Sequence, residues 1–212
     1  MNSHNKPAQK AIHANNQPME VAFHSGPGLS NSLQAVGFEM DFAQFSRGRL
    51  KGSFQLGGSR QLPVLSIQTN QDLLLQGNRR RGVLPLSLST TDQLPVVRGK
   101  GAQPGSLHGF QTNLSDAFVQ LPSGAHIQVA LISQTGFEKL ATATGDHQTL
   151  EVIYRSNSAN LHPQRFAEIS SLIQAQLMGG GKEDLVEVAA LEALSPHQLQ
   201  GTASGESVWG RD

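Results

Sequence analysis

The 212-residue sequence contains no cysteine, so disulfide bonds, thiolate metal sites and cysteine nucleophiles are excluded. Hydrophobic residues make up 37% of the chain and aromatic residues 5%, which is enough for a core but not for a large one. No apolar run approaches the roughly 18 residues of a transmembrane helix, and the polar first eighteen residues lack the apolar centre of a secretory signal. We expect a disordered polar leader over residues 1–20 and a cytoplasmic protein that does not enter a membrane.

The chain also has no excess of charge, because 16 Lys or Arg balance 16 Asp or Glu. The formal value is +0, so no global field attracts the chain to nucleic acid. Residues 41–101 nevertheless hold nine Lys or Arg and three Asp or Glu, a local balance of +6, and residues 182–212 hold two against six, a balance of −4. An asymmetry of this size is more typical of surface bias than of a binding footprint.

The middle of the chain alternates apolar and polar residues with period two, which is the pattern of half-buried strands. The runs LPVLSIQTN, GVLPLSLST and AHIQVALIS show it, and glycine and proline cluster between such runs. Short strands separated by turn residues predict an antiparallel β-barrel or sandwich. Pro85 lies inside one run and predicts a strand edge or a bulge there.

After residue 160 the pattern becomes helical. HPQRFAEISSLIQAQLMGGG places its apolar residues on one face of a helix that Pro163 begins and Gly179–Gly181 end. A second helix begins near Glu183 and Asp184, which favour a helix N-terminus. We expect a helical hairpin over residues 161–200 and a flexible end over 201–212. The apolar stripe of the hairpin packs either on the barrel or on a second copy of the chain.

The sequence shows no convergent set of catalytic residues. None of its eight histidines has the close spacing that places two nitrogens on one metal, and only His108 and His126 fall within the β-rich part. The glycine-rich stretches lack the spacing of phosphate-binding or dinucleotide-binding loops. We therefore expect no enzyme activity, no metal and no cofactor. The alternative is a small metal-dependent enzyme that uses His108 and His126 with a carboxylate.

Three consecutive arginines, Arg79–Arg81, raise the question of nucleic-acid contact. They stand between Gly77 and Gly82 and between two apolar runs, which is typical of a solvated connection between strands. Phosphate contact would need further basic residues on the same face, and no aromatic residue lies nearby for base stacking. We predict that these arginines face water.

Three longer segments, SIQTNQDLLLQGNRRRGVLPLSL, VQLPSGAHIQVALIS and GFEKLATATG, together form a larger pattern. They resemble a strand–turn–strand segment, a later hairpin and the segment before the helices in the N-terminal sensory domains of AraC/XylS-type transcription regulators. The resemblance covers residues 38–178. The glycine-rich and glutamine-rich style also resembles regulators of marine cyanobacteria.

The resemblance implies an α+β fold, with a cupin-like antiparallel β-barrel or sandwich over residues 21–160 that senses an effector. The hairpin that follows would form a homodimer. Members of the family bind DNA through two helix-turn-helix units, and the eleven residues after Gly201 have no room for them. We therefore expect the sensory domain of a regulator, either a fragment or a stand-alone domain, with DNA contact only through a domain absent from this sequence.

Candidate site residues follow from this interpretation. The effector, a small molecule or a protein, is expected to contact inward-facing strand residues: Phe54, Ile67, Leu86, Phe118 and Val129. The homodimer is expected to use one face of the first helix of the hairpin: Phe166, Ile169, Ile173 and Leu177. A third interpretation is a β module that binds a protein partner and no small molecule.

Overall fold

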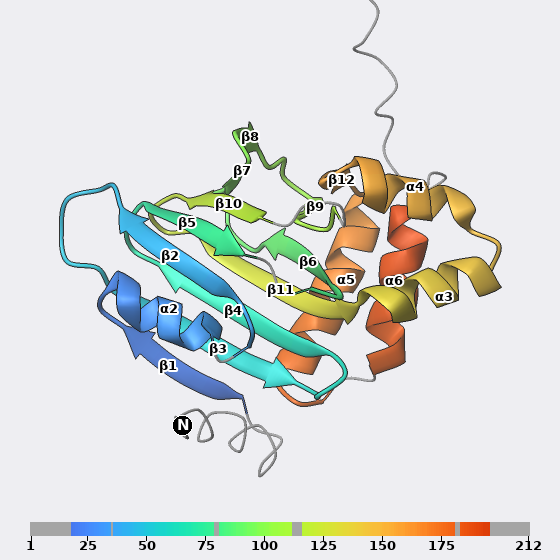
Figure 1. Ribbon diagram of the computed structural model, residues 1–212, viewed down its shortest axis with the longest axis horizontal. Helices are drawn as coiled ribbons and strands as arrows, with labels where there is room; N and C mark the ends of the chain where they lie inside the picture. The colour runs from blue at the N-terminus through green and yellow to red at the C-terminus, as the bar shows by residue number, and fades with distance from the viewer. Residues whose placement is uncertain (1–17, 35, 79–80, 112–115, 181–182, 196–212) are drawn as a thin grey trace, which may run out of the picture.

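Two antiparallel sheets face each other in the computed structural model, which describes residues 18–34, 36–78, 81–111, 116–180 and 183–195 (Figure 1). The seven-stranded sheet contains, in order, β1 (Met19–Phe23), β3 (Gly52–Gly58), β4 (Pro63–Thr69), β11 (His126–Ser133), β6 (Val83–Ser89), β9 (Ser106–His108) and β12 (Ser158–Asn160). The five-stranded sheet contains, in order, β2 (Glu39–Gln44), β5 (Leu73–Asn78), β10 (Asp116–Leu121), β7 (Val96–Val97) and β8 (Lys100–Gly101). The predicted α+β class is confirmed, and the described strands form a sandwich rather than a closed barrel.

The described ranges also contain five helices: α2 (Gly26–Gln34), α3 (Gln134–Ala143), α4 (His147–Arg155), α5 (Pro163–Leu177) and α6 (Glu183–Leu194). Helix α2 lies against β2 at one end of the sandwich, whereas α3 to α6 gather at the other (Figure 1). None of these helices is long and apolar enough to cross a membrane. The sequence predicted α5 and α6 but not α2, α3 and α4, which lie within the region assigned to the barrel.

The predicted ends of the chain lie mostly outside the described residues. Strand β1 begins at Met19, so Met19 and Glu20 belong to the sandwich and not to the leader. The segment 201–212 is not described, and its predicted flexibility stays a prediction.

The predicted helical hairpin is confirmed. Pro163 is the first residue of α5, where the missing backbone N–H has no intrahelical acceptor, and His162 caps the helix by accepting a hydrogen bond from the N–H of Gln164. Helix α6 packs against α5, and Arg165 joins the two helices through an ion pair with Glu192 at 3.3 Å.

The central strands of the seven-stranded sheet are buried on both faces. The core between the sheets includes Phe54, Leu56, Leu65, Ile67, Ile127 and Val129. The core between the seven-stranded sheet and the helices includes Val64, Leu84, Leu86, Leu88, Ala130 and Ile132. Because successive residues of a strand point to opposite faces, β4, β6 and β11 each contribute side chains to both cores.

Three of the four residues predicted for the dimer interface are buried in the helix-side core. Ile169, Ile173 and Leu177 are at most 1% exposed, and Phe166 packs against the same cluster. This face of α5 contacts β3, β4 and β11 of its own chain, as in the intrachain alternative. A homodimer stays a prediction, and Ile169, Ile173 and Leu177 are not available to its interface.

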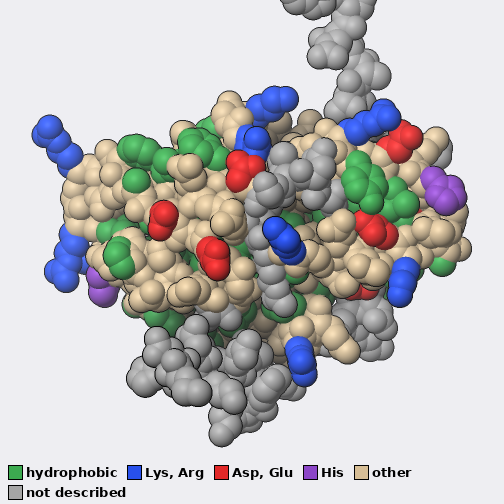
Figure 2. Space-filling model, viewed as in Figure 1, with side chains coloured by type: hydrophobic (Ala, Val, Ile, Leu, Met, Phe, Trp, Pro, Cys, Tyr) green, Lys and Arg blue, Asp and Glu red, His purple; other side chains and the backbone are tan. Residues whose placement is uncertain are grey.

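The arginine run connects β5 of one sheet with β6 of the other. Arg81 is exposed, as predicted, whereas Arg79 and Arg80 lie outside the described residues. On the face shown in Figure 2, basic and acidic side chains are interspersed rather than grouped by sign.

Pro85 lies at a local strand edge, as the sequence predicted. It pairs with Leu131 of β11, and the described β6–β9 pairing is confined to Ser87.

Candidate ligand-binding site

One row of cross-strand neighbours runs over the inner face of the seven-stranded sheet. The pairing register joins Leu56, Leu65, Val129, Ser87, His108 and Ser158 in that order, from β3 to β12. Directly paired residues share a face, so all six point toward the five-stranded sheet. The row changes from aliphatic to polar at Ser87, which gives the interior of the sandwich an apolar part and a polar end.

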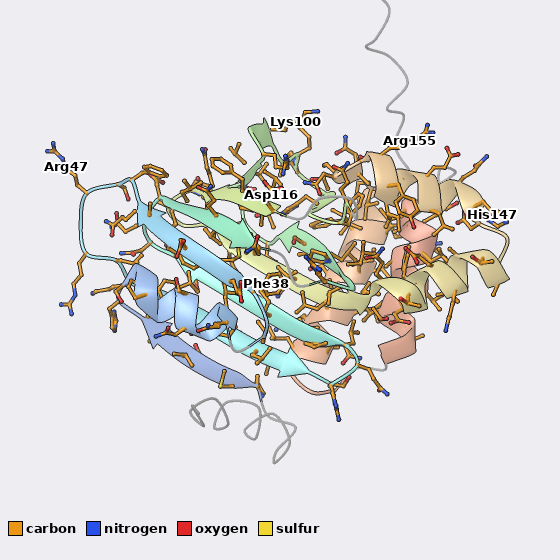
Figure 3. All side chains as sticks on the ribbon, viewed as in Figure 1. Phe38, Arg47, Lys100, Asp116, His147 and Arg155 are labelled. Atoms are coloured by element: carbon orange, nitrogen blue, oxygen red, sulfur yellow. The ribbon has the colours of Figure 1, made fainter. Side chains whose placement is uncertain are left out.

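A cavity of about 80 Å³ lies in the apolar part. The seven-stranded sheet contributes Ile67, Ile127 and Val129 to its wall, and the five-stranded sheet contributes Leu75, Ala117 and Val119. Phe38, which follows α2, also lines the cavity and lies near the middle of the sandwich (Figure 3). The cavity is therefore formed by both sheets together.

The residues predicted for the effector pocket are distributed over three environments. Ile67 and Val129 line the cavity, and Phe54 is fully buried in the same core without lining it. Phe118 points away, because its neighbours Ala117 and Val119 are the residues of β10 that line the cavity. Leu86 lies in the helix-side core and has no access to the cavity.

His108, which the sequence offered only as a candidate metal ligand, stands where the apolar and polar parts meet. Its side chain is 3% exposed, and burial lowers its pKa to about 4 although a backbone hydrogen bond with Ser106 acts in the opposite direction. The imidazole is therefore neutral near pH 7. Among the described residues, its Nδ1 atom has no hydrogen-bond partner. A buried polar atom without a partner costs about 1–3 kcal/mol, so this nitrogen favours a water or a ligand group that pairs with it.

A polar cleft of about 310 Å³ lies on the other side of His108. It shares Val97 and His108 with the cavity, and its remaining wall includes Arg98, Lys100, Gln111, Arg155, Asn157 and Ser158. The Arg98 guanidinium donates to both carboxylate oxygens of Asp116 at 2.9 Å. Figure 3 shows Lys100, Asp116 and Arg155 along the edge of the sandwich nearest β8 and α4.

The structure does not support the alternative of a metal held by His108 and His126. His126 precedes Ile127, which lines the cavity, so His126 points to the helix side of the sheet whereas His108 points to the cavity side. The Nε2 atom of His126 lies 2.7 Å from Ser66 Oγ, and Nδ1 lies 2.7 Å from Thr90 Oγ1. These bonds link β4, β11 and the loop after β6, so His126 serves as a cross-link. In the described ranges no group of three potential metal ligands occurs.

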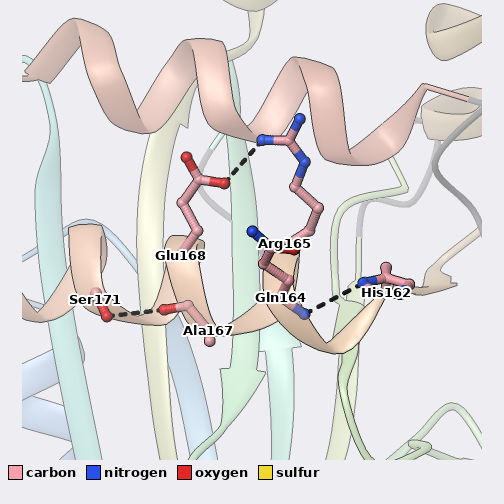
Figure 4. A pocket seen from close by; sticks show the side chains of 6 residues that line it. All are labelled: His162, Gln164, Arg165, Ala167, Glu168 and Ser171. Atoms are coloured by element: carbon pink, nitrogen blue, oxygen red, sulfur yellow. Dashed lines mark hydrogen bonds and ion pairs between the residues drawn. The ribbon is translucent and has the colours of Figure 1, made fainter.

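Another hollow lies at the start of α5 and is explained by local helix structure (Figure 4). His162 caps the helix, Arg165 pairs with Glu168 at 2.8 Å, and Ser171 donates to the carbonyl of Ala167. These groups satisfy one another on an open surface. The cavity together with its adjoining cleft is therefore taken as the candidate site.

No protein-family model matches the chain, and no curated protein matches it. Among solved structures, the chain is similar to the one described as "Crystal structure of the AraC-like transcriptional activator CuxR". The TM-score is 0.55 and the sequence identity 11%, over 88% of this chain and 73% of that chain. At this identity the likeness shows the fold alone, and at that level it agrees with the resemblance drawn from the sequence.

Proposed function

We propose that this chain is the effector-sensing domain of an AraC-type transcription regulator, with the cavity between the two sheets as its effector site. The observation that carries the proposal is the apolar cavity with one polar end, inside a fold shared with an AraC-like activator. Ligand sites are typically apolar hollows with a few polar groups that fix orientation, and His108 and Ser87 supply such groups here.

The double-sided sheet suggests how a ligand would act. Val129 and Ile127 face the cavity, whereas the residue between them, Gln128, donates a hydrogen bond to Gln174 of α5. A ligand that favours one position of β11 would therefore favour one position of the hairpin. This is a population shift, in which the differential affinity for two arrangements sets the response. DNA contact would come from a domain outside this sequence.

A substitution that fills the cavity tests the proposal. Ala117 lines the cavity and is 7% exposed, so Ala117→Leu would place three further carbon atoms in the space for the ligand. A small molecule found by thermal-shift screening should stabilise the wild-type chain by about 2.7 kcal/mol at a hundredfold excess over Kd. We expect this stabilisation to vanish in Ala117→Leu.

The matched control is Ala43→Leu, because Ala43 lies on β2 of the same sheet with its side chain exposed. This variant should keep the full ligand-induced rise in Tm. If no metabolite raises the Tm of the wild-type chain, the effector site is wrong and a β module for a protein partner becomes the better interpretation. A ligand that binds Ala117→Leu as tightly as wild type would place its site elsewhere.

The homodimer is a separate proposal. Sedimentation velocity at tens of micromolar should give twice the 22.7 kDa of one chain, since a working dimer persists at that concentration. We expect Ile173→Ala to lower the free energy of unfolding by about 2–5 kcal/mol without changing the mass, because Ile173 is buried within its own chain. A wild-type mass of one chain would rule out the dimer.

A further inference from the structure

We propose that the effector is a small apolar acid, whose anionic head binds in the cleft lined by Arg98, Lys100 and Arg155 and whose apolar tail enters the cavity. This inference rests on the proposed function, because it assigns a chemical class to the ligand of the same site. It is carried by three observations: the cations around the cleft, the unpartnered His108 nitrogen at its base, and the size of the cavity behind it.

The cleft collects cations from two segments of the chain, the β7–β8 hairpin and the end of α4. Arg98 lies in the β7–β8 turn, Lys100 begins β8, and Arg155 ends α4. Two carboxylates oppose them, since Asp116 binds Arg98 and Glu151 lies 3.9 Å from Arg155 in an exposed pair. An exposed ion pair such as Arg155–Glu151 is weak, so Glu151 neutralises little of the charge on Arg155. Lys100 has no ion-pair partner among the described residues, so the cleft keeps an excess of positive charge.

His108 gives the cleft a donor in its buried wall. Its neutral imidazole carries one N–H. To donate to an acceptor oxygen in the cleft, the ring must carry this hydrogen on Nδ1, in place of the tautomer whose Nε2–H serves the Ser106 carbonyl. Ser87 lies beside it on the cavity side, and Ser158 pairs with it on the cleft side. A carboxylate placed here would accept from the imidazole and face the cations, while its carbon chain would continue along the row toward Val129.

The backbone at Arg98 supports a role for its side chain. Residues 98 and 99 connect β7 and β8 in a two-residue turn with φ of 51° at Arg98 and 76° at Gly99. Turns of this kind favour asparagine or glycine at the first position, and an arginine is strained there. The chain therefore holds an arginine beside the cleft at a conformational cost that asparagine or glycine would avoid.

The dimensions limit the tail of the ligand. The cavity of about 80 Å³ is much smaller than the cleft of about 310 Å³. It is also smaller than the roughly 300–1,000 Å³ of pockets that hold drug-sized ligands. The geometry thus points to a short aliphatic or single-ring tail with a solvated anionic head.

A matched pair of ligands tests this inference by isothermal titration calorimetry. Hexanoate and hexanamide have the same tail and differ in charge. We expect hexanoate to bind at least about tenfold more tightly, since a charge-assisted hydrogen bond contributes more than a neutral one. The preference should shrink in Lys100→Gln and in Arg155→Gln, vanish in the double variant, and weaken with added salt. Both side chains are exposed, so the fold is preserved.

The control is Arg47→Gln, an exposed arginine at the opposite end of the molecule (Figure 3), which should leave the preference unchanged. If hexanoate and hexanamide bind equally, or if the preference for hexanoate survives in the double variant, the cleft does not bind an anionic head. The proposed function would remain intact in either case. If inorganic phosphate binds and hexanoate does not, the claim that the ligand has an apolar tail is wrong. A third outcome is that neither hexanoate nor hexanamide binds, whereas a neutral ligand from the thermal-shift screen binds wild type and not Ala117→Leu. In that case the acidic ligand class is wrong and the proposed function stands.

Discussion

Replacing Gly57 with valine should lower the free energy of unfolding by about 3 kcal/mol or more, because no side chain fits where β3 meets the end of α5. A Cβ at position 57 would lie 2.1 Å from the backbone oxygen of Leu177 and 2.8 Å from its carbonyl carbon. These are backbone atoms, so the contact is relieved only by moving α5 away from the sheet. Urea unfolding of wild type and variant measures the difference.

Gly28→Ala is the matched control for this prediction. A Cβ at Gly28 would lie 3.4 Å from Ser25 Oγ and 3.5 Å from Phe23 Cβ, which is ordinary contact. Gly28 lies inside α2, where alanine is favoured over glycine by up to about 1 kcal/mol, so this variant should be as stable as wild type or more stable. Gly57→Ala should show a smaller loss than valine. Wild-type stability of Gly57→Val would mean that α5 does not approach β3 this closely.

The second large effect is a loss of stability in acid that depends on His108. Burial lowers the pKa of His108 to about 4 in the folded chain, from 6.5 in the unfolded chain. Between these values the unfolded state binds a proton that the folded state does not, so the free energy of unfolding falls as the pH falls from 6.5 to 4. At about 1.4 kcal/mol per pH unit, the loss amounts to about 3 kcal/mol.

The measurement is urea unfolding across this pH range for wild type and His108→Phe. The variant removes the titrating group and should lose about 3 kcal/mol less between pH 6.5 and pH 4. Burial also lowers the pKa of His126, but that contribution is present in both proteins and cancels in the comparison. Parallel curves for wild type and His108→Phe would contradict a buried neutral imidazole.

The strands of the core were predictable because alternation is strong in this chain, but the face that each strand presents was not. In β4 and β11 the predicted apolar residues do face the opposite sheet, as Ile67 and Val129 show. In β6 the leucines face the helices, and the intervening Pro85 and Ser87 line the cavity. Period-two alternation distinguishes two faces of a strand, but it does not show which face meets the second sheet when both are buried.

The helices that were missed have weak local signals. Helix α2 reads GPGLSNSLQ, whose glycines and proline are typical of a loop, yet the Ser25 hydroxyl accepts from the N–H of Gly28 at the helix start. Helix α3 begins the same way, with Ser133 accepting from the N–H of Gly136. Helix α5, in contrast, has Pro163 at its start and a long apolar stripe. Tertiary packing therefore decides the short helices.

The sequence offered His108 only as a metal ligand, because its place in the site comes from strand pairing. Its neighbours in the site, Ser87 and Ser158, stand 21 and 50 positions away and meet it only through the sheet register. A lone histidine in the segment SLHGF carries no signal of burial or of an unpartnered nitrogen. The cleft is likewise formed by residues that are distant in the sequence, since the pairing of β9 with β12 brings the segments of Arg98 and Arg155 together.

The burial of β11 on both faces has a practical consequence for changing this protein. Along this strand Ile127, Val129 and Leu131 belong to the core between the sheets, whereas Ala130 and Ile132 belong to the core beneath the helices. Under the proposed function, variant libraries confined to odd-numbered positions would change the cavity wall that meets the effector, and libraries confined to even-numbered positions would change the packing of the hairpin on the sheet. If the cavity binds an effector as proposed, selecting from the two libraries separately would alter ligand specificity without altering the hairpin, or alter the hairpin without altering the ligand site.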